Sequence, residues 1–416
     1  MTEQKPVQTQ NNPSAGAESA AQIVLPAGAI TGLSLAAFTS GVSMRVTDPL
    51  LPRLAGDFSL TVGHASLVIT VFSVAYGISQ LVFGPLGDRF GKYRVIAWGT
   101  MACALATAVC AMATNFEWLL AGRALAGSMA AAIIPLAMAW IGDVVPYQRR
   151  QTVLARFLIG QIMGVSAGVL LGGYAADHLH WRAPFVVIAA MCAVVGVFLF
   201  WIRRRMPAAA LKCQRSEGSA IGRMVREFGL VLSVPWARVV LLTVFAEGAL
   251  VFGAFAFMVT HLHQVHGLAL AQAGQIVMLF GFGGFLFAIG AHYLVHRLGE
   301  AGLCRWGGGL LLLSYSFVAW ATSWWYAMPA CFLAGLGFYM VHNTLQINAT
   351  QMAPERRGAA VAAFAACYFI GQSAGIAVSS VLLSRLGTSG VIALCGVGVL
   401  LVALNFARLL GLRRRI

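Results

Sequence analysis

The sequence predicts an all-α membrane protein with twelve transmembrane helices, arranged as two parallel repeats of six. Its 416 residues are 59% hydrophobic and 10% charged, with a mean hydropathy of +0.81, so the charges are too few to cover a soluble surface of this size. Apolar stretches of roughly 20 residues, long enough to cross the hydrocarbon core of a bilayer, recur twelve times. Features of the first half of the chain also return in the second half.

The twelve stretches are expected to be helices, because an unpaired backbone group in lipid is costly and no stretch alternates like a barrel strand. They cover residues 28–51, 65–86, 94–114, 118–141, 152–174, 183–203, 236–259, 270–295, 302–322, 325–349, 358–384 and 388–408.

The longest internal polar stretch divides these spans six and six. It predicts a cytoplasmic linker at 204–235 between a first bundle at 26–203 and a second at 236–410. Residues 1–25 are polar and lack the pattern of a secretory signal, so we expect a disordered cytoplasmic tail. Residues 411–416 are expected to form a basic cytoplasmic tail.

The net charge of +15 is distributed unevenly along the chain. With the N-terminus in the cytoplasm and twelve crossings, 23 of the 28 Lys and Arg residues fall on the cytoplasmic side. The positive-inside rule therefore predicts that both termini lie in the cytoplasm, and it supports an even number of spans. We expect a multi-pass protein of the bacterial inner membrane. This distribution explains the basic composition without a nucleic-acid partner.

Segments of the second half repeat the first at an offset of 208 residues. Arg89-x-Gly91 aligns with Arg297-x-Gly299, and, with three more residues inserted, FLIGQIMG from Phe157 aligns with YFIGQSAG from Tyr368. An offset of six spans preserves orientation, so the halves are parallel repeats with a substrate path expected at their interface. The same offset pairs two charged residues with apolar ones: Arg45 with Gly253, and Asp48 with Ala256.

The loop after the second span reads GPLGDRFGKYR. It resembles the loop G-x-L-x-D-R-x-G-R/K-K/R of the major facilitator superfamily. From the residues alone it is a tight, positively charged turn, whereas the resemblance implies a conformational latch that stabilises one access state. The matching residues are Gly84, Leu86, Asp88, Arg89, Gly91 and Lys92.

Three further segments resemble motifs of this family. Thr47-Asp48-Pro49-Leu50-Leu51-Pro52 resembles the T-D-x-x-L-P segment of twelve-span drug:proton antiporters and small-metabolite exporters, and Arg123-x-x-x-Gly127 resembles a motif of proton-coupled members. Glycines in the fifth span resemble the motif of antiporters, although the usual Gly-Pro pair is Gly168-Val169 here. Their spacing also allows close helix packing; they are Gly160, Gly164, Gly168 and Gly172.

Four ionisable side chains inside spans are candidates for proton coupling, because a charge in the membrane is costly: Arg45, Asp48, Arg123 and Glu247. Arg45 and Asp48, three residues apart, form either a structural ion pair or a proton and substrate site. Pro49 predicts a bend or break there. Glu247 has no Lys or Arg within one turn, so it either finds a partner on another helix or is protonated in one state.

The tenth span carries polar groups three to four residues apart, on one helical face. Lining of a substrate cavity is one interpretation, and hydrogen bonding between helices is the other. The substrate-binding candidates are Tyr339, His342, Asn343 and Gln346, with Thr350 on the same face.

These features predict a secondary transporter that exports a small organic molecule in exchange for protons by alternating access. The alternative is proton-coupled uptake of a small metabolite; a membrane receptor would need a signalling domain longer than any polar segment here.

No P-loop, HExxH or GxSxG is present, so we expect no enzyme activity and no cofactor. For His261, His263 and His266 we expect no metal and an interfacial position. The expected partners are a small-molecule substrate, protons and the bilayer, and we expect a monomer.

Overall fold

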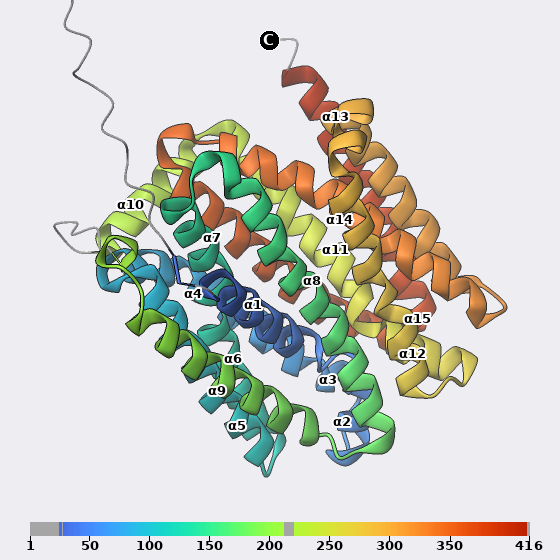
Figure 1. Ribbon diagram of the computed structural model, residues 1–416. Coiled ribbons are helices and arrows are strands. Elements are labelled where there is room, and N and C mark those ends of the chain that lie inside the picture. Colours follow the sequence, from blue (N-terminus) through green and yellow to red (C-terminus); the bar gives the residue numbers. More distant parts are fainter. Residues whose placement is uncertain (1–24, 27, 212–219, 414–416) are drawn as a thin grey trace, which may run out of the picture.

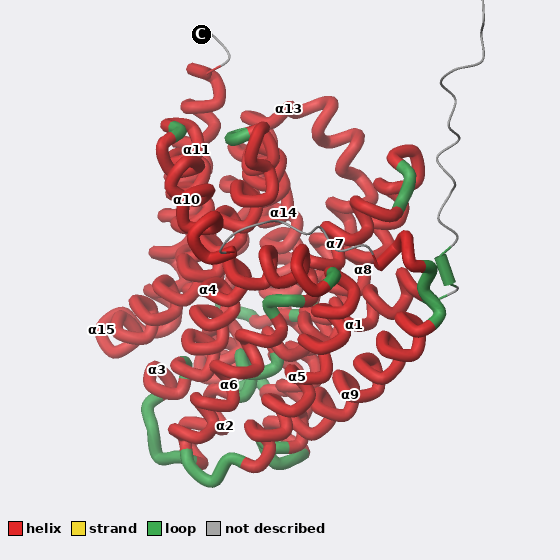
Figure 2. The backbone as a smooth tube through the Cα atoms, turned by 90° about the vertical axis from the view of Figure 1, so that its left-hand side faces the viewer, coloured by secondary structure: helices red, strands yellow, loops and turns green. Residues whose placement is uncertain are grey.

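The computed structural model describes residues 25–26, 28–211 and 220–413, and this part of the chain contains helices and loops but no strand (Figure 2). The predicted N-terminal tail lies almost entirely outside the described residues. So do the last three residues of the basic tail and the middle of the predicted linker.

Twelve crossings are present, as the sequence predicts. Within the described residues, nine helical stretches are long and apolar enough to cross a membrane. Two of them, Leu270–Trp320 and Pro354–Arg413, hold two crossings each, because the helix is interrupted at Gly299 (φ 63°) and Gly387 (φ 64°). Glycine adopts a positive φ without the strain of a Cβ. The remaining crossing is the first span, which is divided into α1 and α2.

The first half consists of α1 (Ala29–Arg45), α2 (Leu51–Asp57), α3 (Val62–Ala65), α4 (Leu67–Phe90), α5 (Lys92–Met112), α6 (Phe116–Ala130), α7 (Ile133–Val144), α8 (Tyr147–His178) and α9 (Ala183–Arg204). Between the halves lie η1 (Ala208–Leu211) and α10 (Ala220–Ser233). The second half consists of α11 (Pro235–His266), α12 (Leu270–Val277), α13 (Leu279–Trp320), η2 (Trp324–Tyr326), α14 (Ala327–Gln351), η3 (Pro354–Arg356) and α15 (Arg357–Arg413). Figure 1 shows their arrangement.

Local sequence sets several of these boundaries. Asn115 begins α6 by accepting a hydrogen bond from the Trp118 N–H at 2.8 Å, as an N-cap residue does. Pro235 occupies the first turn of α11, where its missing N–H is not needed. Gly267 ends the same helix with φ 66°, the left-handed conformation typical of a C-terminal glycine.

The bundle has two ends, which we name by the turns that they carry. The outer end carries turns 58–61, 113–115, 179–182, 267–269 and 321–323 and Gly387. The inner end carries Gly91, 145–146, 205–207, Gly299 and 352–356. In Figure 1 the last turns of α15, in dark red, lie near the upper, inner end, and α2 and α12 lie toward the opposite end.

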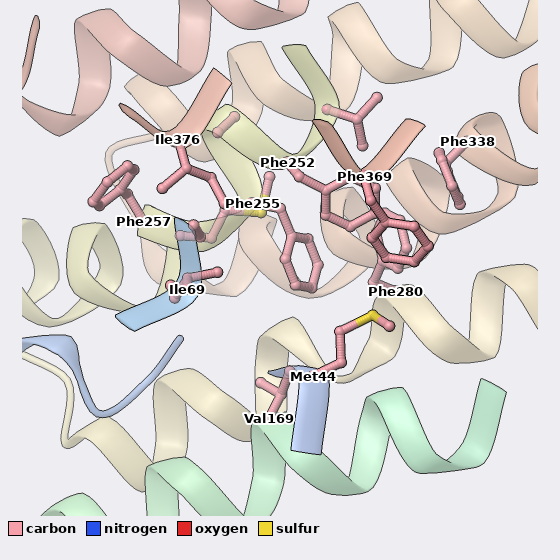
Figure 3. Packing of buried hydrophobic residues seen from close by; sticks show 14 of the residues in the cluster. Met44, Ile69, Val169, Phe252, Phe255, Phe257, Phe280, Phe338, Phe369 and Ile376 are labelled. Atoms are coloured by element: carbon pink, nitrogen blue, oxygen red, sulfur yellow. The ribbon is translucent and has the colours of Figure 1, made fainter. Parts of the chain in front are cut away.

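The two halves pack on each other through three main pairs of helices: α4 with α15, α8 with α12, and α8 with α13. At the outer end of this interface, the Ala271 N–H donates to Asp177 Oδ2 at 2.6 Å, and Gly63 lies against the backbone of Ser380. Apolar side chains of both halves form one buried cluster between these contacts, and Figure 3 shows Met44 beside Phe280 within it. The halves are therefore sealed against each other toward the outer end.

The close contacts of glycines define the repeat more finely than the sequence alignment does. Gly160 lies against the carbonyl of Ser34, and Gly371 lies against the carbonyl of Phe245. Gly371 and Phe245 each follow their counterparts by 211 residues, not by 208. The three extra residues therefore already count in the seventh span, and Arg45 corresponds to Ala256 rather than to Gly253.

Candidate functional site

The first span breaks where Pro49 predicts it. Helix α1 ends at Arg45, α2 begins at Leu51, and the segment between them is a series of turns. Within it the Asp48 N–H donates to Arg45 O at 3.3 Å, and the Leu50 N–H donates to Thr47 O at 3.1 Å. The break places Arg45 at the end of α1 and Asp48 in the turns between α1 and α2. Backbone polar groups of these turns remain inside the membrane.

Arg45 joins the two halves of the molecule. Its Nη1 lies 3.5 Å from Asp48 Oδ2, its Nη2 donates to Gln372 Oε1 at 2.9 Å, and its guanidinium lies 4.0 Å from the centre of the Phe252 ring. Arg45 and Asp48 are both almost completely buried. The ion pair considered from the sequence is therefore present, and it extends to the second half through an amide and an aromatic ring.

Gln372 is not among the site residues predicted from the sequence. Its Oε1 accepts from Arg45, and its Nε2 donates to Ser73 Oγ at 2.7 Å, so the amide is held by α1 and α4 of the opposite half. A fully buried amide needs such partners. One available signal was its presence in the repeated IGQ segment, where it corresponds to Gln161.

Asp48 is only weakly held in this arrangement. Within the described residues, neither of its buried carboxylate oxygens accepts a hydrogen bond, and the buried Thr47 Oγ1 beside it is also without a partner. The charge of Asp48 is therefore balanced chiefly by Arg45.

Arg123 is bound to backbone and to an aromatic ring. Its Nε donates to Val68 O at 3.2 Å, its Nη1 donates to Ser43 O at 3.0 Å, and its guanidinium lies 4.1 Å from the centre of the Phe72 ring. The side chain is completely buried. It connects the helices of the first, second and fourth spans.

Glu247 has a partner on another helix. Its Oε2 lies 2.9 Å from His342 Nδ1, whereas its buried Oε1 has no hydrogen-bond partner within the described residues. Glu247 is 1% exposed and His342 is 18% exposed. The rings of Phe338 and Tyr368 lie 5.1 Å and 4.8 Å from the imidazole, centre to centre. One side of the pair is therefore accessible and walled by aromatic rings.

Aromatic contacts connect this pair to the Arg45 network. Phe252, which faces the Arg45 guanidinium, lies 5.8 Å from Tyr368, and Tyr368 contacts His342. The two buried carboxylates thus belong to neighbouring but separate ion pairs.

The polar face of α14 is partly accessible along its length. Tyr339, Asn343 and Gln346 are half-buried, and their side chains form no hydrogen bond to another helix in the part of the chain described. Thr350 Oγ1 donates to the carbonyl of Ile347 in its own helix at 2.6 Å. Side chains that hold helices together would form hydrogen bonds with a neighbouring helix. Their absence here favours the interpretation that this face lines a cavity.

The glycines of α8 lie along α1. A Cβ added at any of them would meet a backbone carbonyl of the first span; Gly160, Gly164, Gly168 and Gly172 face Ser34, Phe38, Val42 and Val46 in that order. The backbones thus approach each other closely, as small residues allow.

The loop between α4 and α5 is held by Lys92. Its Nζ lies 3.5 Å from Asp88 Oδ1 and 2.6 Å from Asp143 Oδ2 at the end of α7. Gly91 turns the chain with φ 91°. Gly84 has open space beside it, and Arg89 is exposed with its guanidinium over the ring of Phe90. Asp143 was not anticipated, because its role depends on the fold of the third and fourth spans.

One expectation about the histidines is wrong. His261 is completely buried rather than interfacial, because its two ring nitrogens lie 2.8 Å from Thr388 Oγ1 and 2.7 Å from the Val318 carbonyl. These bonds satisfy the imidazole inside the second half.

Twelve membrane crossings in two repeats, with charged networks buried where the repeats meet, define a multi-pass membrane transporter rather than an enzyme. Residues 33–376 match the Major Facilitator Superfamily, and the chain belongs to this family. Transporters of this family carry small-molecule substrates.

Several curated relatives are transporters. The chain is 29% identical over 268 residues to the MFS-type transporter YwfA of Bacillus subtilis, which covers 64% of each chain. It is 24% identical over 352 residues to YceJ of the same bacterium, covering 83% of this chain and 86% of YceJ. It is 29% identical over 199 residues to the multidrug export protein EmrB of Escherichia coli, covering 48% of this chain and 38% of EmrB. The chain thus spans less than two thirds of YwfA and EmrB.

Solved structures share the fold. A bacterial homologue of the human lysosomal transporter Spinster, in an inward-facing and unoccupied conformation, gives a TM-score of 0.69 at 17% identity, covering 91% of this chain and 94% of that one. The human organic anion transporter MFSD10 gives 0.70 at 18% identity, covering 91% and 98%. At such identities the likeness shows the fold alone.

Proposed function

We propose that this protein exports a small amphipathic organic molecule from the cytoplasm in exchange for protons, by alternating access. The observation that carries the proposal is the position of Arg45, which is shared between Asp48 in its own half and Gln372 in the other half. A change of charge on Asp48 therefore acts directly on a contact between the two halves.

The coupling follows from the cost of a buried charge. While Asp48 is ionised, its carboxylate competes with Gln372 for the Arg45 guanidinium. When Asp48 takes up a proton from the outer side, a buried guanidinium without that counter-charge is strongly unfavourable, so Arg45 depends more on Gln372 and the Phe252 ring of the other half. Protonation thus favours the sealed outer end, and release of the proton to the cytoplasm allows the substrate-loaded protein to open outward. Arg123, bound to the carbonyl of Ser43 two residues before Arg45, positions the end of α1 during this step.

The substrate would occupy the accessible surface of α14. Tyr339, Asn343 and Gln346 offer unpaired hydrogen-bonding groups, and the Glu247–His342 pair adds a polar anchor between aromatic rings. A few polar groups in an aromatic wall suit an amphipathic organic molecule. The likeness to EmrB, a multidrug export protein, supports export of such compounds.

The remaining parts of the proposal concern movement and orientation. The bundles at 26–203 and 236–410 would rock as units about the linker at 204–235, and the Asp88–Lys92–Asp143 contacts would stabilise one access state. The distribution of Lys and Arg supports a protein of the bacterial inner membrane with its inner end and both termini in the cytoplasm. We further propose that it works as a monomer.

Proton-coupled uptake is the second candidate. It is favoured by one departure from the antiporter pattern, the Gly168-Val169 pair where antiporters carry Gly-Pro. Export and uptake use the same fold, so only transport measurements distinguish one from the other.

The test is the accumulation of fluorescent amphipathic dyes in cells that lack the protein and in cells that overproduce it. Export predicts lower accumulation in the overproducing cells, and a protonophore should remove the difference. Higher accumulation on overproduction would instead support uptake. Equal accumulation across a chemically varied panel would contradict the proposed substrate class.

A further inference from the structure

We propose that a groove on the outside of the first half binds one acyl chain of an anionic phospholipid, with the lipid phosphate held by Arg94 and Arg89. The groove is a cavity of about 310 Å³ between α4, α5 and α6, which is at the lower end of the range for ligand pockets. It lies apart from the polar face of α14 and from the Arg45 network.

The lining of the groove is apolar except at one end. On α4, Phe83 and Phe90 face it, and on α5 it is lined by Arg94, Trp98 and Ala102, each four residues after the last. Met129 contributes from α6. Residues four apart share a helical face, so the arginine, the indole and the alanine mark successive depths along one wall.

The depth of the groove matches one leaflet of a bilayer. Eight residues separate Arg94 from Ala102, and at 1.5 Å per residue they span about 12 Å. Half of a hydrocarbon core is about 15 Å. Arg94 lies in the first turn of α5, beside the Gly91 turn of the inner end, so the charged end of the groove lies where a lipid headgroup would be.

The arginines at this end lack a counter-charge. Within the described residues, neither Arg94 nor Arg89 forms a hydrogen bond or an ion pair, and the Arg89 guanidinium lies 5.2 Å from the centre of the Phe90 ring. The neighbouring carboxylates of Asp88 and Asp143 are both paired with Lys92. Guanidinium groups bind phosphate oxygens through paired hydrogen bonds, so two free guanidinium groups beside an apolar groove complement an anionic headgroup joined to an acyl chain.

The test uses the quenching of Trp98 fluorescence in nanodiscs. The full-length protein is titrated with phosphatidylglycerol or phosphatidylcholine that carries bromine on its acyl chains. The difference in quenching between the wild type and Trp98→Phe is the Trp98-dependent quenching, and it measures how far the groove is occupied. A juxtamembrane arginine contributes about fivefold to the binding of an anionic lipid. We therefore expect the apparent dissociation constant for phosphatidylglycerol to rise about fivefold in Arg94→Gln, and further in Arg89→Gln/Arg94→Gln. Ala102→Phe should remove the Trp98-dependent quenching by either lipid.

Arg305→Gln is the matched control, because Arg305 is an exposed arginine near the inner end of the second half. It should behave like the wild type. A circular-dichroism unfolding curve for each variant separates loss of binding from loss of fold. Equal affinity for the two lipids in the wild type would overturn the headgroup site. Unchanged Trp98-dependent quenching in a folded Ala102→Phe variant would overturn the acyl-chain site.

Discussion

Arg45 in α1 and Gln372 in α15 are 327 positions apart in the chain and are joined by a hydrogen bond of 2.9 Å. The same amide donates to Ser73 in α4. A single buried glutamine of the second half is therefore bound to two helices of the first, at the point where the charge of Asp48 is balanced.

Gln372→Ala should loosen the seal between the halves, because it removes the amide that binds both Arg45 and Ser73. A hydrogen bond to a charged group contributes about 1.5–3 kcal/mol, so we expect the outer end to open at least about tenfold more often. The measurement is the rate at which an impermeant thiol reagent labels Ser380→Cys, which lies at the outer contact with Gly63.

Gln161→Ala serves as the control for this experiment. Gln161 is the counterpart of Gln372 in the repeated segment, and its side chain makes no hydrogen bond within the described residues. Its labelling rate should equal that of the otherwise unchanged Ser380→Cys protein. An unchanged rate in Gln372→Ala would show that the amide does not hold the halves together.

Gly164→Ala should destabilise the first half, because the added methyl group meets the carbonyl of Phe38 in α1. Overpacking of this kind costs about 1–3 kcal/mol. Gly142→Ala is the control, since nothing lies within 4 Å of the position of its Cβ, and alanine there should be neutral or slightly stabilising. Thermal unfolding of the purified variants decides the matter: equal midpoints would contradict close packing of α8 on α1.

Glu247 and His342 should behave as a coupled pair. Glu247→Gln is expected to change substrate affinity or range while transport stays driven by the pH gradient, because the carboxylate lies outside the Arg45 network. His342→Gln leaves a buried acid without its partner, and we expect a larger loss of stability in that variant than in Glu247→Gln/His342→Gln. A double-mutant cycle on unfolding free energies should give a coupling of about 0.5–3 kcal/mol. Additive effects would show that the 2.9 Å contact between Glu247 and His342 contributes no coupling energy.

The sequence was sufficient for the architecture because the bilayer imposes it. Spans must be apolar and roughly 20 residues long, so their number follows from hydropathy. The break in the first span was predictable for an equally local reason, since Pro49 restricts the backbone of Asp48. The interruption at Gly299 was also within reach, because Gly299 corresponds to Gly91 in the repeat.

The partners of the charged residues were not predictable from one sequence. Whether Arg45 meets Gln372, Glu247 meets His342, or Lys92 meets Asp143 depends on how helices distant in the chain pack together. His261 shows the same limit: its position near the end of a span suggested the interface, and its bonds to Thr388 and Val318 bury it.

The most direct test of the account is uptake of the substrate into inverted membrane vesicles, driven by a pH gradient, in Asp48→Asn. Asp57→Asn is the control, because Asp57 is a solvent-accessible carboxylate of the same span, 3.2 Å from Arg53 Nε. The account predicts that Asp48→Asn still binds substrate but shows no gradient-driven uptake, while Asp57→Asn transports like the wild type. Undiminished gradient-driven uptake in Asp48→Asn would contradict the account and move proton coupling to Glu247 or Arg123.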